Sequence, residues 1–273
     1  MRAEPRSHWP EYAIEAWALG TFMVSAGLAT ALVEHPDFGI RTLIASDAVR
    51  RLLIGIAMGV TAIALIYSPW GKRSGAHMNP AVTLTFLALG KVRRADALGY
   101  IGAQFVGGVA GVALVLTLLG ERFTAPPVAF VLTQATHGLR VAFALEWLIS
   151  FVLMTVVLAL SSRERLARYT GVAAGGLVAT FIALEGPYSG MSMNPARSFA
   201  SAAVAGQWAD LWIYFVAPPL GMLTAAYVHV KRAAAIGCAK LMHGGGARCI
   251  HCGYGPRLGT ESFRLGGLTH GND

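Results

Sequence analysis

The stretch SGMSMNPARS, Ser189 to Ser198, lies between two long apolar runs and decides how the rest of the chain is interpreted. A close copy, SGAHMNPAVT, occupies Ser74 to Thr83. Both copies share the pattern Ser-Gly-x-x-Met-Asn-Pro-Ala, and only the second continues with an arginine, Arg197. Self-similarity within a chain indicates that its parts repeat one structural unit, so the sequence predicts two equivalent halves.

Long apolar runs surround the two copies. Of the 273 residues, 55% are hydrophobic and 13% are charged, against about 25% charged in a typical soluble domain. A bilayer span needs about 20 apolar residues, and six runs come close to that length: Tyr12–Val33, Ala48–Tyr67, Asp96–Leu119, Leu139–Leu160, Thr170–Leu184 and Leu211–His229. Six such runs leave too little polar surface for a water-soluble bundle, so the composition predicts an all-α membrane protein.

The net charge of +8 indicates topology rather than a nucleic-acid partner. If the spans alternate in direction, most of the 22 Lys and Arg residues fall on one side. Cytoplasmic loops carry such an excess, so both termini are predicted to be cytoplasmic, with the protein in the plasma membrane. We expect an N-terminal segment of residues 1–11, a membrane domain of residues 12–230 with repeats near 12–119 and 139–229, and a cytoplasmic tail of residues 231–273.

Other residues recur at matching places in the two halves. Asn79 and Asn194 each follow the second span of a half and precede the third, and Glu15 in the first span is echoed by Glu146 in the fourth. Because each half has three spans, an odd number, the halves enter the membrane in opposite orientations. Inverted repeats of this kind place discontinuous helices and a substrate path at the bilayer midplane.

The Asn-Pro-Ala triplets predict the starts of two short helices. Asn is a strong N-cap, and Pro is favoured at the first helical position. About ten apolar or small residues follow each triplet, so each helix rises ~15 Å, half of a hydrocarbon core of ~30 Å. Two such half-helices from opposite faces meet at the centre. The triplets are Asn79, Pro80 and Ala81, and Asn194, Pro195 and Ala196.

The meeting point has the chemistry of a selective passage. With the Asn side-chain oxygens capping their own helices, the amide NH₂ groups of Asn79 and Asn194 are expected to donate into the lumen. Both helices point the positive ends of their dipoles there. Neutral hydrogen-bonding molecules are favoured at such a place and cations are repelled.

From Tyr12 to His229 the sequence closely resembles the major intrinsic protein family, the aquaporins and glycerol facilitators. SGAHMNPAVT and MNPARS are the motifs that carry the resemblance. It implies six transmembrane helices plus two re-entrant half-helices in an inverted 3+3 repeat. It also implies one pore per subunit and a homotetramer in the lipid bilayer.

Arg197 matches the arginine of the family's narrow extracellular-side filter. A charge within a membrane is costly and marks a functional candidate, and the guanidinium offers five donors. The alternative is a structural Arg paired with a carboxylate such as Glu185. The other filter positions match Met58, with Gly59 as the second candidate, Ile182 and Met191.

The predicted filter lacks the aromatic ring and the His of water-specific members. Met side chains are flexible, which leaves room for solutes larger than water; the alternative is that these Met and Ile residues only pack or face lipid. Ser198 and Ala202 replace the acidic and basic residues that glycerol facilitators place after the arginine, and Tyr214 with Phe215 resembles the aromatic pair of water channels.

These markers predict a passive channel for water, open also to small neutral solutes, with no cofactor. One alternative is a facilitator mainly for glycerol, urea, ammonia, hydrogen peroxide or metalloid acids. An ion-coupled secondary transporter also uses inverted repeats, but carboxylates are scarce inside the spans. An enzyme is not expected, because the sequence has no phosphate-binding Gly loop and no nucleophile–base pair that can be placed.

Three further residues have two interpretations each. Glu15 and Glu146 form the relay in a proton-coupled transporter, whereas the family resemblance implies that they hydrogen-bond the backbone of the re-entrant loops. His77, beside the first motif, is a pH sensor or a plain hydrogen-bonding residue. The resemblance favours structural support for all three.

All three cysteines follow the last span, in CAKLMHGGGARCIHCGY, Cys238 to Tyr254. Cys and His ligands suit a tetrahedral zinc site, but the spacing is irregular and only one C-x-x-C is present. A reduced, flexible, Gly-rich tail is therefore the leading expectation, with a metal site as the alternative. The candidate ligands are Cys238, His243, Cys249 and Cys252, with His251 nearby.

Because no cysteine lies in the predicted pore, we expect that mercurials do not plug the lumen directly. The measurement is water flux into proteoliposomes before and after mercurial treatment. Strong block that persists after replacement of all three tail cysteines contradicts this assignment of the pore.

Overall fold

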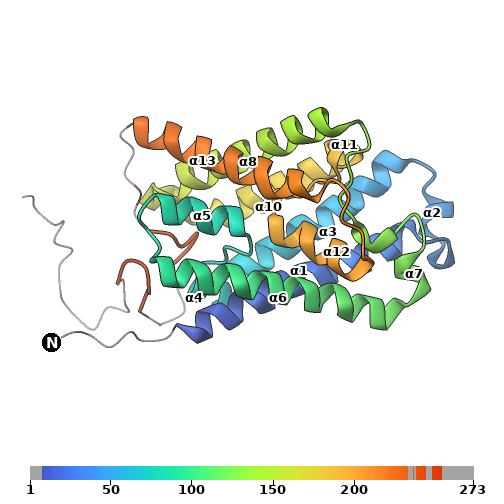
Figure 1. Ribbon diagram of the computed structural model, residues 1–273, viewed down its shortest axis with the longest axis horizontal. Helices are drawn as coiled ribbons and strands as arrows, with labels where there is room; N and C mark the ends of the chain where they lie inside the picture. The colour runs from blue at the N-terminus through green and yellow to red at the C-terminus, as the bar shows by residue number, and fades with distance from the viewer. Residues whose placement is uncertain (1–7, 233–235, 237, 244–247, 254–273) are drawn as a thin grey trace, which may run out of the picture.

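The computed structural model describes residues 8–232, 236, 238–243 and 248–253 (Figure 1). The parts of the predicted termini at residues 1–7 and 254–273 lie outside the described residues. Within the described residues every regular element is a helix. The long helices are α1 (Trp9–Glu34), α3 (Asp47–Tyr67), α6 (Arg94–Leu119), α8 (Leu139–Ser161), α10 (Thr170–Leu184) and α13 (Leu211–Lys231).

The remaining helices are short. The two half-helices are α5 (Pro80–Ala88) and α12 (Pro195–Ala205), and both begin at the Pro that the sequence predicted. The connecting helices are α2 (Ile40–Leu43), α4 (Pro69–Ser74), α7 (Glu121–Thr124), α9 (Glu164–Ala167) and α11 (Gly186–Ser189), with the 3₁₀ turns η1 (Pro36–Phe38) and η2 (Ala129–Val131).

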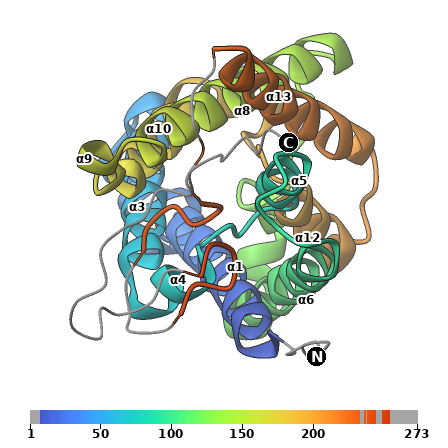
Figure 2. The ribbon, with the colours of Figure 1, turned by 90° about the vertical axis from the view of Figure 1, so that its left-hand side faces the viewer.

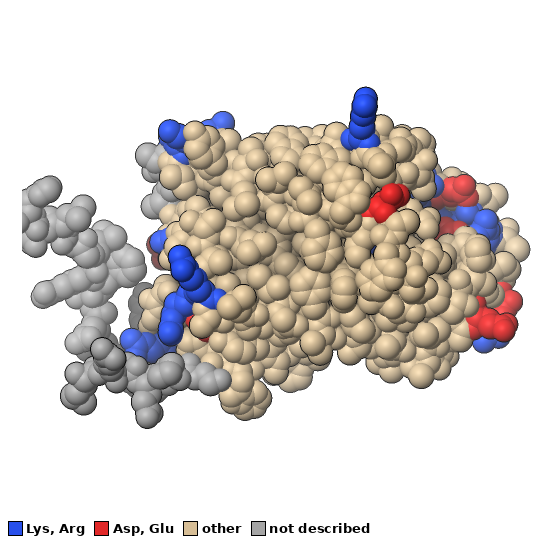
Figure 3. Space-filling model, in the orientation of Figure 1, with Lys and Arg blue, Asp and Glu red and all other residues tan. Residues whose placement is uncertain are grey.

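Five of the long helices have the length and apolarity to cross a membrane. The exception is α10, which has the bounds that the sequence predicted but only 15 residues. It rises about 22 Å, less than the ~30 Å of a hydrocarbon core, and α11 follows it after one residue. In the view of Figure 3, charged side chains gather toward the two ends of the molecule and a broad band between them carries almost none. The protein is an integral, multi-pass membrane protein.

The helix packing repeats between the halves. The most extensive contacts join α1 to α6 and, equivalently, α8 to α13, while α3 against α10 joins the two halves. The half-helix α5 packs on α13 and α12 packs on α6, as the end-on view shows (Figure 2). Each half-helix therefore rests on the last long helix of the opposite half, so neither half is complete alone.

Two glycines at equivalent positions set the closeness of the main helix pairs. A Cβ on Gly107 of α6 would lie 2.0 Å from the carbonyl oxygen of Ala16, and a Cβ on Gly221 of α13 would lie 2.2 Å from that of Trp147. Small residues allow helix backbones to approach in membranes, where packing replaces the hydrophobic driving force. These contacts hold Glu15 and Glu146, one residue away, at fixed depth.

We expect Gly107→Ala and Gly221→Ala each to destabilise the protein, because backbone must move to accommodate the methyl group. Overpacking of this kind costs about 1–3 kcal/mol. Thermal unfolding of the purified protein in detergent measures the effect. The matched control is Gly102→Ala on α6, where a Cβ meets nothing within 4 Å; equal melting temperatures for all three variants would contradict the packing argument.

Candidate functional site

The two half-helices are capped by the asparagines of the repeated motif. The Oδ1 atom of Asn79 accepts the N–H of Ala81 at 2.8 Å. The Oδ1 atom of Asn194 accepts the N–H groups of Ala196 at 3.0 Å and Arg197 at 3.2 Å. Both caps satisfy N–H groups that a helix start leaves without a partner.

The amide groups of the same asparagines link the two loops. Asn79 Nδ2 donates to the carbonyl of Met193, and Asn194 Nδ2 donates to the carbonyl of Met78, both at 2.7 Å. The expectation that the whole NH₂ group is free for the lumen was therefore wrong. An amide nitrogen carries two hydrogens, so one from each Asn fastens the opposite loop and one remains for the cavity.

The loops before the half-helices hold strained backbone at matching positions. Ala76 and Met78 in the first loop, and Met191 and Met193 in the second, have φ between 46° and 53°. Residues other than glycine seldom adopt this left-handed region, and such strain persists only where the surroundings enforce it.

Two buried glutamates provide that enforcement. Glu15 accepts the N–H groups of His77 at 3.0 Å and Met78 at 2.6 Å. Glu146 accepts those of Ser192 and Met193, both at 2.7 Å. Both glutamates are fully buried.

Hydroxyl groups complete the two carboxylate sites. Ser74 donates to Glu15 and Ser189 donates to Glu146, each at 2.7 Å. A buried carboxylate is tolerated when donors surround it in this way. The side chain of Gln104 also donates to Glu15, at 2.9 Å, so both carboxylates are bonded to the backbone and side chains that surround the re-entrant loops.

A cavity of about 500 Å³ runs past the two asparagines. Every predicted filter residue lies in its wall, as does His77; the filter residues are Met58, Ile182, Met191 and Arg197. Gly59 instead faces α10, since a Cβ there would lie 2.6 Å from the carbonyl oxygen of Gly175. The structure thus places Met58, and not the second candidate, beside the cavity.

The remaining motif residues lie behind the wall. Ala81 and Ala196 are fully buried in hydrophobic clusters on either side of the cavity. Pro80 and Pro195 are buried at the first helical positions. Their contribution is to start the half-helices at a fixed place.

Long helices supply an apolar wall opposite the loops. On α1, α3, α8 and α10 the lining residues recur every three or four positions, so one face of each of these helices is turned toward the cavity. On α1 this face includes Phe22, an aromatic residue that lies outside the sequence motifs. The cavity is therefore lined by apolar side chains of the long helices and by polar atoms of the two re-entrant loops.

Arg197 is the charged group of this passage. It is 8% exposed, and its Nη1 donates to the carbonyl of Val131 at 3.0 Å. No carboxylate among the described residues lies within 4.0 Å of its guanidinium, so the alternative ion pair with Glu185 does not form. At the equivalent position of the first half-helix, Val82 also lines the cavity.

The end of the cavity beside α2 and the start of α3 carries charged residues that the motifs did not reveal. Arg50 is 3% exposed, and its Nε lies 3.1 Å from both carboxylate oxygens of Glu34. Arg41 and Arg51 also line this end. The pattern that could have found Arg50 and Arg51 is the spacing of about four residues from Met58 back along α3.

The opposite end is closed in by part of the tail, a contact that no sequence motif indicated. The Nε2 atom of His77 lies 2.9 Å from the carbonyl oxygen of Ala239, and Leu241 contributes to the cavity wall. His251 stacks on His77 with 6.0 Å between ring centroids. Burial lowers the pKa of His251 to about 4, so this ring brings no charge to this end of the cavity at neutral pH.

These features define a helical membrane protein with one lined cavity at the meeting point of two re-entrant half-helices. Residues 7–229 match the model of the family described as Major intrinsic protein. The chain belongs to this family.

Several proteins are similar to the chain. Aquaporin NIP6-1 from Arabidopsis thaliana is 38% identical over 212 residues, covering 77% of this chain and 65% of that protein. Aquaporin NIP1-3 from rice, Oryza sativa subsp. japonica, is 33% identical, covering 77% and 70%. The chain spans less than two thirds of the first of these relatives.

A solved structure shows the same fold. The aquaglyceroporin from Plasmodium falciparum aligns with a TM-score of 0.69 and 21% identity, covering 82% of this chain and 96% of that one. At this identity the likeness extends to the fold alone.

We expect Glu15→Ala and Glu146→Ala each to loosen a re-entrant loop, because each leaves two buried backbone N–H groups unpaired at about 1–3 kcal/mol per group. Lower melting temperature in detergent and reduced water permeability are the readouts. The matched control is Glu164→Ala, at the exposed first residue of the short helix α9. Unchanged behaviour of Glu146→Ala would contradict the supporting role.

Proposed function

We propose that the protein is a passive transmembrane channel that conducts water and small neutral solutes and excludes ions and protons. The observation that carries the proposal is that Asn79, Asn194 and Arg197 line one cavity, two of them at the tips of facing half-helices. The aquaporin names of the relatives support it. A channel needs no covalent chemistry, so no enzymatic role is proposed.

Within this function, Asn79 and Asn194 each offer one remaining N–H to permeating molecules. Arg197 with Met58, Ile182 and Met191 forms the selectivity filter. Its positive charge repels cations while its donors replace part of a solute's hydration. Glu15, Glu146 and His77 hold the loops.

A facilitator mainly for small uncharged solutes is the second candidate. It is favoured by the apolar, flexible side chains of Met58, Ile182 and Met191 in the cavity wall. An ion-coupled transporter has less support, because Glu15 and Glu146 are committed to loop backbone.

We further propose a homotetramer in the plasma membrane with both termini cytoplasmic. Figure 3 supports this orientation through the Lys and Arg side chains at the end that carries the tail. The channel unit is residues 12–230, followed by the tail at residues 231–273.

Stopped-flow light scattering of proteoliposomes tests the function. An impermeant osmolyte should cause rapid shrinkage, faster than in empty liposomes. Glycerol and urea gradients then separate the candidates: absence of solute-driven reswelling indicates selectivity for water, and comparable reswelling indicates the facilitator. Shrinkage no faster than in empty liposomes refutes the channel.

Arg197→Val copies the residue of the first motif into the second. We expect water flux to persist and proton or cation leak to appear, because the fixed positive charge is lost. A pH-sensitive dye inside the liposomes measures the leak. The control is Arg140→Val, at an exposed position at the start of α8; leak in both variants, or in neither, would contradict the filter role of Arg197.

A further inference from the structure

Four side chains of the tail converge beside the inner end of the cavity. The Sγ atoms of Cys238, Cys249 and Cys252 and a ring nitrogen of His243 all lie within 4.8 Å of one another. They come from three turns of chain that are separated in sequence. The irregular spacing that weakened a zinc interpretation from sequence is therefore brought together by folding.

The distances suit a shared ion better than a covalent bridge. The Sγ atoms of Cys238 and Cys249 are 3.6 Å apart, and His243 Nε2 lies 3.1 Å from Cys252 Sγ. A disulfide requires about 2.05 Å between sulfurs. Tetrahedral zinc with Zn–S bonds of about 2.3 Å places its ligand atoms about 3.5–3.8 Å from one another. Small movements of the four side chains would therefore bring their ligand atoms to the distances that zinc requires.

Backbone donors support the sulfurs as they do in metal centres. The N–H of Lys240 points to Cys238 Sγ at 3.5 Å, and the N–H of His251 points to Cys249 Sγ at 3.4 Å. The C-x-x-C turn is closed by the N–H of Gly253 on the carbonyl of Cys249 at 3.0 Å. Such outer contacts orient ligands and stabilise thiolate charge.

We propose that Cys238, His243, Cys249 and Cys252 bind one zinc ion and that the ion fastens the tail over the inner mouth of the channel. Binding requires three thiolates and a neutral imidazole, so up to three protons leave to solvent as the Zn–S bonds form. The resulting centre carries a net charge of −1. Lys240, 4% exposed in the same loop, supplies a nearby positive charge.

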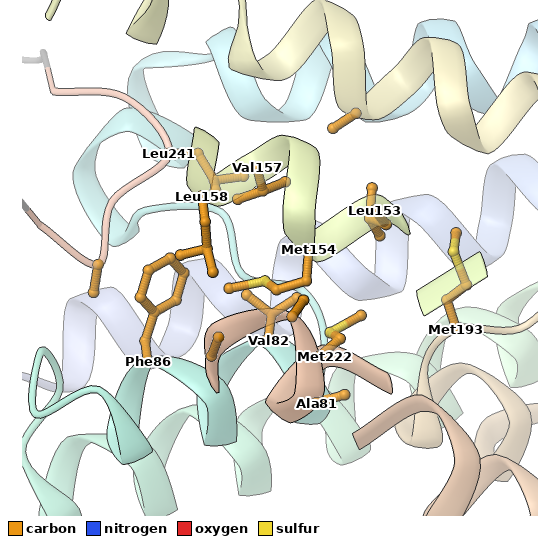
Figure 4. Close-up of a cluster of buried hydrophobic side chains, with 14 of the residues drawn as sticks. Ala81, Val82, Phe86, Leu153, Met154, Val157, Leu158, Met193, Met222 and Leu241 are labelled. Carbon is orange, nitrogen blue, oxygen red and sulfur yellow. The ribbon is translucent and has the colours of Figure 1, made fainter. Parts of the chain in front are cut away.

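The link to the channel is the loop between the first two ligands. Leu241 lies in that loop, is 6% exposed, and packs in the same cluster as Phe86 and Val82 (Figure 4). The His77 contact to Ala239 and the weak bond from the N–H of Leu241 to the carbonyl of Gly75 at 3.5 Å hold it there. Zinc fixes both ends of this loop, so its removal frees Leu241 to leave the cavity wall. This gating step rests on the proposed channel function.

Metal content of the full chain, purified without an affinity tag and loaded with zinc before desalting, tests the site. We expect about one tightly held zinc per chain and its loss in Cys249→Ser/Cys252→Ser. Cobalt in place of zinc should give the strong visible absorption of a tetrahedral thiolate centre. The matched control is His251→Asn, which lies between the two cysteines but stacks on His77 and should retain zinc. The site is overturned if the wild type does not retain zinc, or if the double variant retains as much zinc as the wild type.

Water permeability in proteoliposomes tests the gate. A membrane-permeant zinc chelator should increase the water permeability of the wild type, and readdition of zinc should reverse the increase. Leu241→Ala should have a higher water permeability than the wild type with zinc still bound. Bound zinc without any effect of the chelator overturns the gate and retains the metal site. Absence of water flux in every variant, with zinc bound as expected, refutes the channel function and leaves the site standing.

Discussion

The structure depends on a reciprocal pair of hydrogen bonds in which each asparagine amide reaches the backbone carbonyl of the opposite loop. Irregular backbone at membrane depth is tolerated only where protein or a watery cavity satisfies its polar groups. Two re-entrant loops meeting at mid-membrane expose many such groups. Asn79 and Asn194 satisfy their own helix starts with one atom and the partner loop with another, so a single residue type meets both demands.

The remaining contacts keep this junction in register. Glu15 and Glu146 accept hydrogen bonds from the strained loop residues Met78 and Met193. The close glycine contacts of α6 and α13 fix the positions of the two glutamates along their helices. Each of these contacts in the first half has an equivalent in the second half. The symmetry is broken at Arg197, where the first half has Val82, and at the inner mouth, where the tail has no counterpart. Selectivity and regulation are accordingly proposed at the two places where the halves differ.

Much of this arrangement could be predicted from sequence because its signals are local. The Asn-Pro starts of the half-helices and the bounds of α10 follow from capping chemistry and apolar run length, and the structure has both. Contacts between distant segments could not be predicted in the same way. Nothing in the motif shows that an Asn amide bonds Met193 or Met78, that Met58 rather than its neighbour faces inward, or that Leu241 returns to the cavity. Each depends on how helices rotate and pack, which a single sequence does not specify.

The two amide–carbonyl bonds between the loops can form only after both halves of the chain have been synthesised. When the ribosome has released the first three spans, the carbonyl of Met78 and the amide of Asn79 still lack their partners, which lie more than a hundred residues further on. The nascent first half must therefore be sheltered by water or by the insertion machinery until Asn194 emerges. A chain that ends between the halves therefore leaves the polar backbone of the first loop without its partner.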